Sequence, residues 1–130
     1  MIFEILGKPI AKGRPRFAKR GNFVSTYTPE ATANYENLVK LMYMQAGGTM
    51  FEGEVAMKIE AFFELPKSAP KRVRKIINIY PHIIKPDADN VAKSVADALC
   101  GYAYKDDSQI TSLLVLKNYG DVAKVVVTIV

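Results

Sequence analysis

The chain has one cysteine and one histidine, Cys100 and His82. A single cysteine excludes a disulfide within the chain and any cysteine-rich zinc site. A single histidine likewise excludes a metal site built from several histidines of one chain. Since there is no disulfide to maintain, we expect the protein to work in a reducing cytoplasm.

The sequence also lacks a long apolar run. No stretch approaches the roughly 18 apolar residues that suggest a membrane-spanning helix. Residues 1–17, MIFEILGKPIAKGRPRF, are not expected to be a signal peptide, because Glu4 interrupts their apolar part. The chain has 130 residues, of which 49% are hydrophobic, and this predicts one soluble globular domain over residues 1–130.

Acidic residues are fewer than basic ones, and the formal net charge is +5. A positive balance is consistent with a nucleic-acid partner but does not establish one. Many of the cations gather in two segments, rich in proline and glycine, that are expected to be loops. The first holds Lys8, Lys12, Arg14, Arg16, Lys19 and Arg20, and the second holds Lys67, Lys71, Arg72, Arg74 and Lys75. Taken alone, each cluster fits a solvated loop surface as well as a phosphate-binding one.

The N-terminal half is expected to contain short strands and one long helix. Residues 1–6 and 23–27 are predicted strands, and the basic segment 7–22 between them is predicted to be an arm or loop. Thr28-Pro29-Glu30 is typical of a helix start, with an N-cap, a first-position proline and an acidic first turn. The helix should run to about Ala46, where Gly47-Gly48 end it. Its predicted buried stripe is Ala31, Tyr35, Leu38, Met42 and Gln45.

The later segments complete an α+β pattern. Residues 54–63 alternate between apolar and charged side chains, which predicts a strand with one buried face. A loop with a short basic helix after Pro70 follows. Residues 110–119 and 123–130 are β-rich and are expected to pair as a closing hairpin. The predicted fold is a small mixed or antiparallel sheet with two main helices packed on it.

Five of the six aspartates fall within residues 85–110, KPDADNVAKSVADALCGYAYKDDSQI. Asp87 or Asp89 could cap a helix that runs from about Asn90 to Leu99 and ends just before Gly101. Its core stripe would be Val91, Val95, Ala98 and Leu99. Another face would align Asp89, Lys93 and Asp97 at intervals of four residues. A capped amphipathic helix with a ladder of charges therefore explains these residues without any activity.

The pair Asp106-Asp107 is less easily explained in this way. If the strand after Gln109 returns beside the helix start, three or four carboxylates converge and repel one another. A hard divalent cation is the usual compensation, and oxygen-only ligands favour Mg²⁺ or Mn²⁺. Such a cation would also reverse the local charge toward a phosphodiester, while the basic segments hold the polyanion by its backbone. An acidic cluster in a basic protein is therefore what a metal-dependent nuclease requires.

The same window closely resembles the RusA family of Holliday-junction resolvases, endonucleases often found in prophages. The resemblance lies in a D-x-D-N pair, a lysine three residues after the asparagine, a D-A-L helix end and a D-D-x-Q element. It extends more loosely through the β-rich tail and through GKPIAKGRPRF, so that it covers most of the chain. It implies a RusA-like fold and a homodimer that nicks two strands symmetrically across a four-way junction in DNA recombination and repair.

The resemblance also implies roles for individual residues. Asp87, Asp89 and Asp107 would be the catalytic Mg²⁺ ligands, with Mn²⁺ as a possible substitute, and Lys93 would assist them. The supporting residues would be Asn90, Asp97, Asp106 and Gln109. We expect the DNA backbone to be bound by Lys12, Arg14, Arg16, Lys19, Arg20, Lys71, Arg72, Arg74 and Lys75.

Two other functions are compatible with the sequence. One is a catalytically silent DNA-binding module of a prophage, whose aspartates only brace a helix. The other is an RNA-binding protein, although the chain lacks an RNP-type aromatic motif. His82, beside Pro81 and just before the aspartates, fits either a substrate contact or a structural role.

Overall fold

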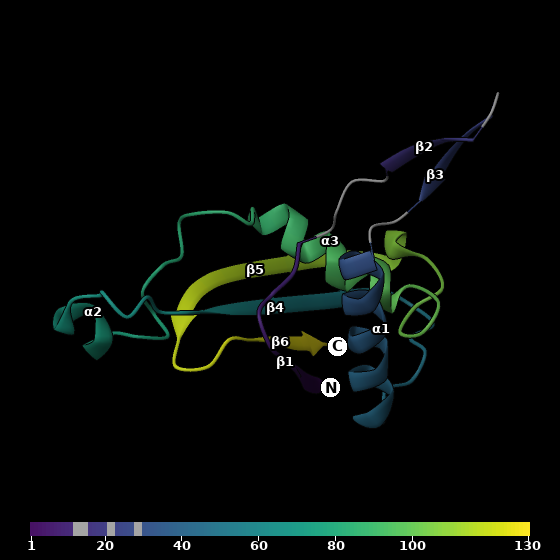
Figure 1. Ribbon diagram of the computed structural model, residues 1–130. Helices are drawn as coiled ribbons and strands as arrows, with labels where there is room; N and C mark the ends of the chain where they lie inside the picture. Colours follow the sequence, from purple (N-terminus) through teal and green to yellow (C-terminus); the bar gives the residue numbers. More distant parts are fainter. Residues whose placement is uncertain (12–15, 21–22, 28–29) are drawn as a thin grey trace.

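The computed structural model describes residues 1–11, 16–20, 23–27 and 30–130, and for residues 16–20 and 23–27 it describes the backbone alone. Within these residues the centre is a four-stranded sheet of order β1-β6-β4-β5 (Figure 1). Its strands are β1 (Ile2–Leu6), β6 (Lys124–Ile129), β4 (Val55–Glu64) and β5 (Ile110–Gly120). Because β6 is antiparallel to β1 and β4 while β4 is parallel to β5, the sheet is of the mixed kind.

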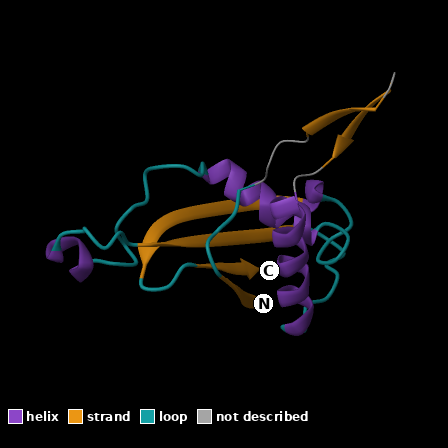
Figure 2. Cartoon of the chain, viewed as in Figure 1, coloured by secondary structure: helices purple, strands orange, loops and turns teal. Residues whose placement is uncertain are grey.

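Two main helices, α1 (Glu30–Gln45) and α3 (Ala88–Leu99), pack on one face of this sheet (Figure 2). The expected α+β fold is confirmed. The predicted core stripe of α3 is also confirmed, since Val91, Val95, Ala98 and Leu99 are all buried. Helix α3 starts two residues before the predicted Asn90 and ends at Leu99 as predicted, and Gly101 just beyond it has a φ of 90°.

Helix α1 ends one residue before the predicted Ala46, and its buried stripe differs from the prediction. It buries Thr32, Tyr35, Val39 and Tyr43, whereas Leu38 and Met42 are half-buried and Ala31 and Gln45 are exposed. The large rings decide which side of the helix turns inward, because the ring of Tyr43 meets that of Phe3 edge-on at 5.4 Å. The helix end is confirmed, with Gly47 at a φ of 82° and its amide bonded to the Met44 carbonyl.

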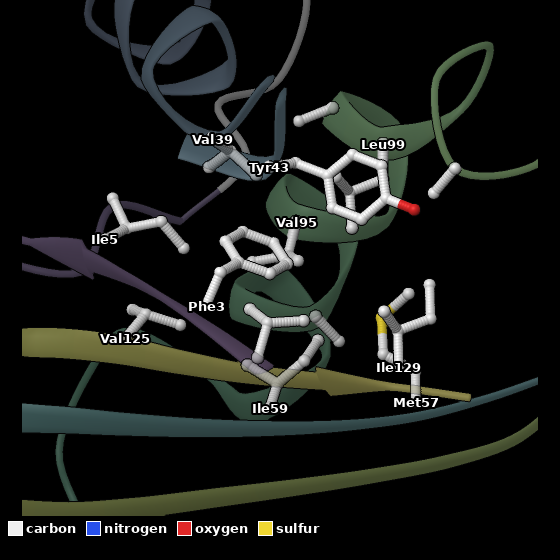
Figure 3. Close-up of a cluster of buried hydrophobic side chains, with 14 of the residues drawn as sticks. Phe3, Ile5, Val39, Tyr43, Met57, Ile59, Val95, Leu99, Val125 and Ile129 are labelled. Atoms are coloured by element: carbon white, nitrogen blue, oxygen red, sulfur yellow. The ribbon is translucent and has the colours of Figure 1, made fainter. Parts of the chain in front are cut away.

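The hydrophobic core lies between the two helices and the sheet (Figure 3). In that view the side chains labelled on α1 and α3 point toward those of β1, β4 and β6. Strand β4 alternates along its length as predicted, because Val55, Met57, Ile59, Ala61 and Phe63 are buried. The alternation places one face of the strand in the core and leaves the other face partly open to solvent.

The predicted hairpin between the last two strands is wrong. Strands β5 and β6 are not neighbours, because β4 lies between them and pairs with both. Glu64 of β4 lies opposite Gly120 and Phe62 lies opposite Lys124, so the short link crosses the end of β4. The physical reason is that β4 satisfies its backbone groups along both edges while its apolar face is covered.

The predicted N-terminal loop is partly wrong, because residues of the basic segment form β2 (Arg16–Arg20). This strand pairs antiparallel with β3 (Phe23–Tyr27), which confirms the second predicted strand. The hairpin projects away from the sheet in Figure 1. The predicted helix start at Thr28 and Pro29 lies outside the described residues.

The short basic helix predicted after Pro70 is confirmed as α2 (Lys71–Lys75). It lies at the opposite end of the molecule from the β2–β3 hairpin (Figure 1). None of the helices described here has both the length and the hydropathy that crossing a membrane requires.

Leu99 offers a test of the packing of α3, since its side chain is fully buried. We expect Leu99→Ala to lower the free energy of unfolding by about 2–5 kcal/mol, because it leaves a cavity between α3 and its neighbours. Leu41, which is 49% exposed on α1, is the matched control. Leu41→Ala should change the free energy by about 0.5 kcal/mol or less. Equal losses in urea denaturation would contradict the packing described here.

Candidate active site

Asp87 and Asp89 lie exposed at the start of α3. Asp87 occupies the N-cap position, as expected for one of the two, but its side chain makes no capping hydrogen bond. Asp89 lies within the first helical turn. Both carboxylates are near the positive end of the helix dipole, which favours negative charge. The carboxylate of Asp87 therefore does not cap the helix, and helix capping does not explain why an aspartate is present at this position.

Lys93 and Asp97 continue the line of Asp89 along the outer part of α3. Lys93 is exposed and Asp97 is half-buried. With a rise of about 1.5 Å per residue, Asp97 lies about 12 Å further along the helix axis than Asp89. Both Lys93 and Asp89 are described, and no ion pair joins them in this structure. The series of charge pairs predicted along this face of the helix is therefore not formed between Asp89 and Lys93.

A one-turn 3-10 helix, η1 (Asp107–Gln109), holds the second acidic pair. Asp106 caps it by accepting a hydrogen bond from the backbone amide of Ser108, at 3.1 Å. Gln109 closes the capping box, because its side-chain oxygen accepts from the amides of Lys105 and Asp106, at 2.9 and 3.2 Å. Asp106 is thus engaged in holding the turn.

The same glutamine ties the turn to a distant part of the chain. Its amide group donates to the backbone carbonyls of Phe51, at 3.0 Å, and Gly53, at 2.9 Å. Residues 51–53 directly precede β4, which pairs with β5. Gln109 therefore fixes the acidic turn against the residues that precede β4.

The two aspartates of this turn have opposite shifts in pKa. The amide of Ser108 and the side chain of Asp107 lower the pKa of Asp106. Contact with the Asp106 carboxylate raises the pKa of Asp107, and partial desolvation and the charge of Asp97 act in the same direction. Of the pair, Asp107 is consequently the carboxylate that has no capping role and that senses the surrounding negative charge.

The described residues place these acids in two groups at the two ends of α3. Burial raises the pKa of Tyr104, and the neighbouring Cys100, Asp107 and Asp97 raise it further, while the Cys100 thiol approaches the Lys105 carbonyl at 3.5 Å. The strand after Gln109 thus begins beside the end of α3 and not beside its start. Among the described residues, no three acidic, histidine or cysteine side chains are grouped so as to hold a metal ion. The oxygen donors have the chemistry that a hard cation requires, but one chain does not arrange them as a cage here.

The basic residues expected to bind DNA lie on two projecting segments. In α2, Arg74 donates to the backbone carbonyls of Pro66 and Lys67, at 3.2 and 3.0 Å, and so braces the preceding loop. The other α2 cations, Lys71, Arg72 and Lys75, are exposed. Strand β2 carries Arg16, Lys19 and Arg20, while Lys12 and Arg14 lie outside the described residues.

A pocket beside Asp87 was not foreseen from the sequence. It has a volume of about 870 Å³, and its lining includes Phe63, His82, Lys85 and Tyr119. Phe63 and Tyr119 lie opposite each other on β4 and β5. Phe63 and Tyr119 are brought together by the parallel pairing of two segments that are far apart in the sequence. The sequence signal for the pocket was therefore limited to the position of His82 just before the aspartates.

His82 is buried in the wall of this pocket. Its ring stacks on that of Phe63 with the centroids 3.7 Å apart, and it meets the Tyr119 ring edge-on at 5.0 Å. Burial and the nearby charge of Lys117 lower the pKa of His82 below its ordinary value. The imidazole is therefore neutral near pH 7.

The chain is similar to known proteins over nearly its whole length. The profile of the family described as Endodeoxyribonuclease RusA matches residues 7–130. An uncharacterized protein of Bacillus subtilis (strain 168), YqaN, is 34% identical over 132 residues, covering 98% of this chain and 93% of YqaN. The similarity thus extends well beyond the acidic motif.

The pKa of His82 can be measured directly, because its ring signals are those of the chain's one histidine. Proton NMR should give a value below about 6.5, and Lys117→Gln should raise it by removing a nearby positive charge. The unfolded state binds this proton more readily, so stability should fall as pH drops from about 6.5 toward the lowered pKa, and the contribution is complete above that window. Lys124→Gln, which alters a lysine paired with Glu4, is the control and should leave the pKa unchanged. A pKa at or above 6.5 would contradict the burial of the ring.

Proposed function

This chain belongs to the RusA family of endodeoxyribonucleases, and on that basis we propose that it is a Mg²⁺-dependent, structure-selective nuclease that resolves Holliday junctions by paired symmetric nicks. Such nicks would serve DNA recombination and repair. The observation in the chain itself that supports the proposal is the start of α3, where Asp87 and Asp89 are exposed and Asp87 makes no capping bond. Carboxylates left without a structural role are those expected of a site that acts on phosphate.

We propose Asp87, Asp89 and Asp107 as the metal ligands. Asp107 is chosen over Asp106 because the latter is engaged as the cap of η1. The support is the chemistry of the donors and the family to which the chain belongs, not a ligand cage in this structure. A bound Mg²⁺ or Mn²⁺ would supply positive charge that offsets the carboxylates and polarises the phosphodiester.

The remaining side chains have roles that follow from their positions. Lys93 is exposed one turn after Asp89, from where its ammonium can offset charge that develops on a phosphate held at the helix start. Gln109 and Asp106 position Asp107 through the capping box and the bonds to Phe51 and Gly53. These contacts orient the proposed ligand without touching the reacting atoms.

The two basic segments are proposed to hold the junction arms. The β2 cations Arg16, Lys19 and Arg20 and the exposed cations of α2 would contact phosphates without reading bases, and the same role is proposed for Lys12 and Arg14 from the sequence alone. The two segments project from opposite ends of the molecule, which suits a substrate with separate duplex arms (Figure 1). A homodimer with two-fold symmetry would present one acidic site to each of two strands.

Cleavage of a synthetic mobile four-way junction, in Mg²⁺ and in chelator, tests the proposal. Paired nicks that require the metal are the expected result. Junction binding without cleavage in either condition would instead identify a silent DNA-binding module. Binding to single-stranded RNA in preference to the junction would point to the RNA-binding alternative.

The three proposed ligands can be tested one at a time. Asp87→Asn, Asp89→Asn and Asp107→Asn should each abolish detectable cleavage, because each removes one ligand charge. Junction binding should survive, since carboxylates repel DNA and the cations grip it. Asp121→Asn is the matched control, because this sixth aspartate lies exposed in the link between β5 and β6. If the Asp87, Asp89 or Asp107 variant cleaves within a few-fold of the unmodified protein, the substituted aspartate is not a metal ligand.

Lys93→Ala should lower the cleavage rate by about 10²-fold or more, because the ammonium is proposed to act on transition-state charge. The thermal unfolding of the variant should be nearly unchanged, since Lys93 is exposed. Lys58→Ala, on the open face of the sheet, is the control lysine and should retain full activity. If Lys93 were only a helix-surface residue, the variant would lose a few tenths of a kcal/mol of stability and keep its activity.

A further inference from the structure

The pocket beside Asp87 has features that the acidic residues do not explain. Its volume of about 870 Å³ falls within the range of about 300–1,000 Å³ that is typical of sites for small ligands. One wall is formed by the rings of Phe63, His82 and Tyr119, of which Tyr119 is half-buried while Phe63 and His82 are only 5% and 6% exposed. Nucleic-acid bases stack on exposed aromatic rings, and in this pocket the partly exposed ring is that of Tyr119.

The aromatic wall is held in place by backbone hydrogen bonds along the outer edge of β5. The amide of His82 donates to the carbonyl of Lys117 at 3.0 Å, and the amide of Tyr119 donates to that of Tyr80, also at 3.0 Å. The ammonium of Lys117 donates to the carbonyl of Ile84 at 2.7 Å. Because the rings are already fixed, a ligand would lose little binding energy in ordering them.

The buried imidazole carries a further sign of an incomplete site. Within the described part of the chain, Nδ1 of His82 is buried and has no hydrogen-bond partner, although the ring is only 6% exposed. Buried polar atoms in native proteins nearly always have a partner, which a water molecule or a bound ligand supplies when the chain does not. The aromatic wall therefore contains one polar atom, Nδ1 of His82, that lacks a hydrogen-bond partner within the described part of the chain.

The lysines in the pocket lining are the groups that could bind a phosphate. Lys8 and Lys85 are cations in its lining, and Glu64 and Asp87 are anions. Lysine ammonium groups bind phosphate oxygens, while aromatic rings bind bases. Asp87 is also a proposed metal ligand, so a nucleotide in this pocket would adjoin the proposed cleavage site.

We propose that the pocket binds one nucleotide of the DNA substrate, with its base against the partly exposed ring of Tyr119, which the His82 ring meets edge-on, and with its phosphate toward Lys8 and Lys85. This inference deepens the proposed function and rests on it for the identity of the polymer. The pocket would then set which nucleotide lies beside Asp87. The choice of cleavage position would come from this contact, and the basic segments would supply affinity alone.

The first test uses the proton resonances of the imidazole, which belong to His82 alone. The full chain, in chelator, is titrated with the dinucleotides d(ApA), d(CpC), d(GpG) and d(TpT) and with a dinucleotide backbone that lacks both bases. We expect the His82 signals to shift saturably with at least one base-containing dinucleotide and not with the abasic backbone. Equal shifts with both would show a phosphate site and overturn the proposal, and so would no shift at millimolar concentrations.

The second test measures junction binding in chelator by fluorescence anisotropy. Tyr119→Leu removes one ring of the wall and should weaken binding by about tenfold or more. Tyr102→Leu is the control, since Tyr102 is 42% exposed and is not part of the pocket. It should bind as the unmodified chain does. Unchanged binding by a folded Tyr119→Leu variant, or equal weakening by the control, would overturn the proposal.

These measurements separate the pocket from the proposed function, because neither of them needs cleavage. Saturable shifts of His82 in a protein that never cuts a junction would leave the nucleotide site standing and reject the nuclease. Metal-dependent cleavage without any shift would reject the site and leave the nuclease standing.

Discussion

The apolar stripe of α3 is the constraint on which the arrangement of the acidic residues depends. Val91, Val95 and Leu99 are buried against α1 and the sheet, and this fixes the rotation of the helix about its axis. With the helix so fixed, Lys93 faces solvent and the carboxylates of Asp87 and Asp89 are exposed at its start. A helix rotated by a quarter turn would bury charge and expose the stripe, which costs several kcal/mol.

The second acidic group is held by different means. The turn at Asp106 is kept by a capping box and by the two hydrogen bonds from Gln109 to residues that precede β4. Asp107 is thereby tied to the residues that precede β4, whereas Asp87 is placed by the packing of α3. The proposed metal ligands therefore stand on two independently anchored elements. The proposed ligands are separated because α3 and η1 are held by different contacts.

Strand β4 connects the acidic groups to the aromatic pocket. Its parallel pairing with β5 brings Phe63 opposite Tyr119, and the residues that follow α2 then add to the outer edge of β5 and carry His82 onto the ring of Phe63. The residues just before β4 receive the bonds of Gln109, and the end of β4 contributes to the wall of the pocket. Strand β4 thus links the acidic turn near the end of α3 to the aromatic pocket near its start.

Features that depend on neighbours along the chain could be predicted from the sequence. The buried stripe of α3, the ends of α1 and α3 at their glycines and the alternation of β4 all follow from helical or strand periods and from local capping, and the structure has them. The motif around Asp87 and Asp107 is equally local, and its residues alone indicate the family. Only the tertiary structure decided that β4 separates β5 from β6, that Tyr43 rather than Gln45 turns inward on α1, and that Asp107 lies beside Asp97. These outcomes depend on which distant apolar faces cover one another and on how backbone groups pair across the sheet, and no spacing within a single segment encodes such contacts.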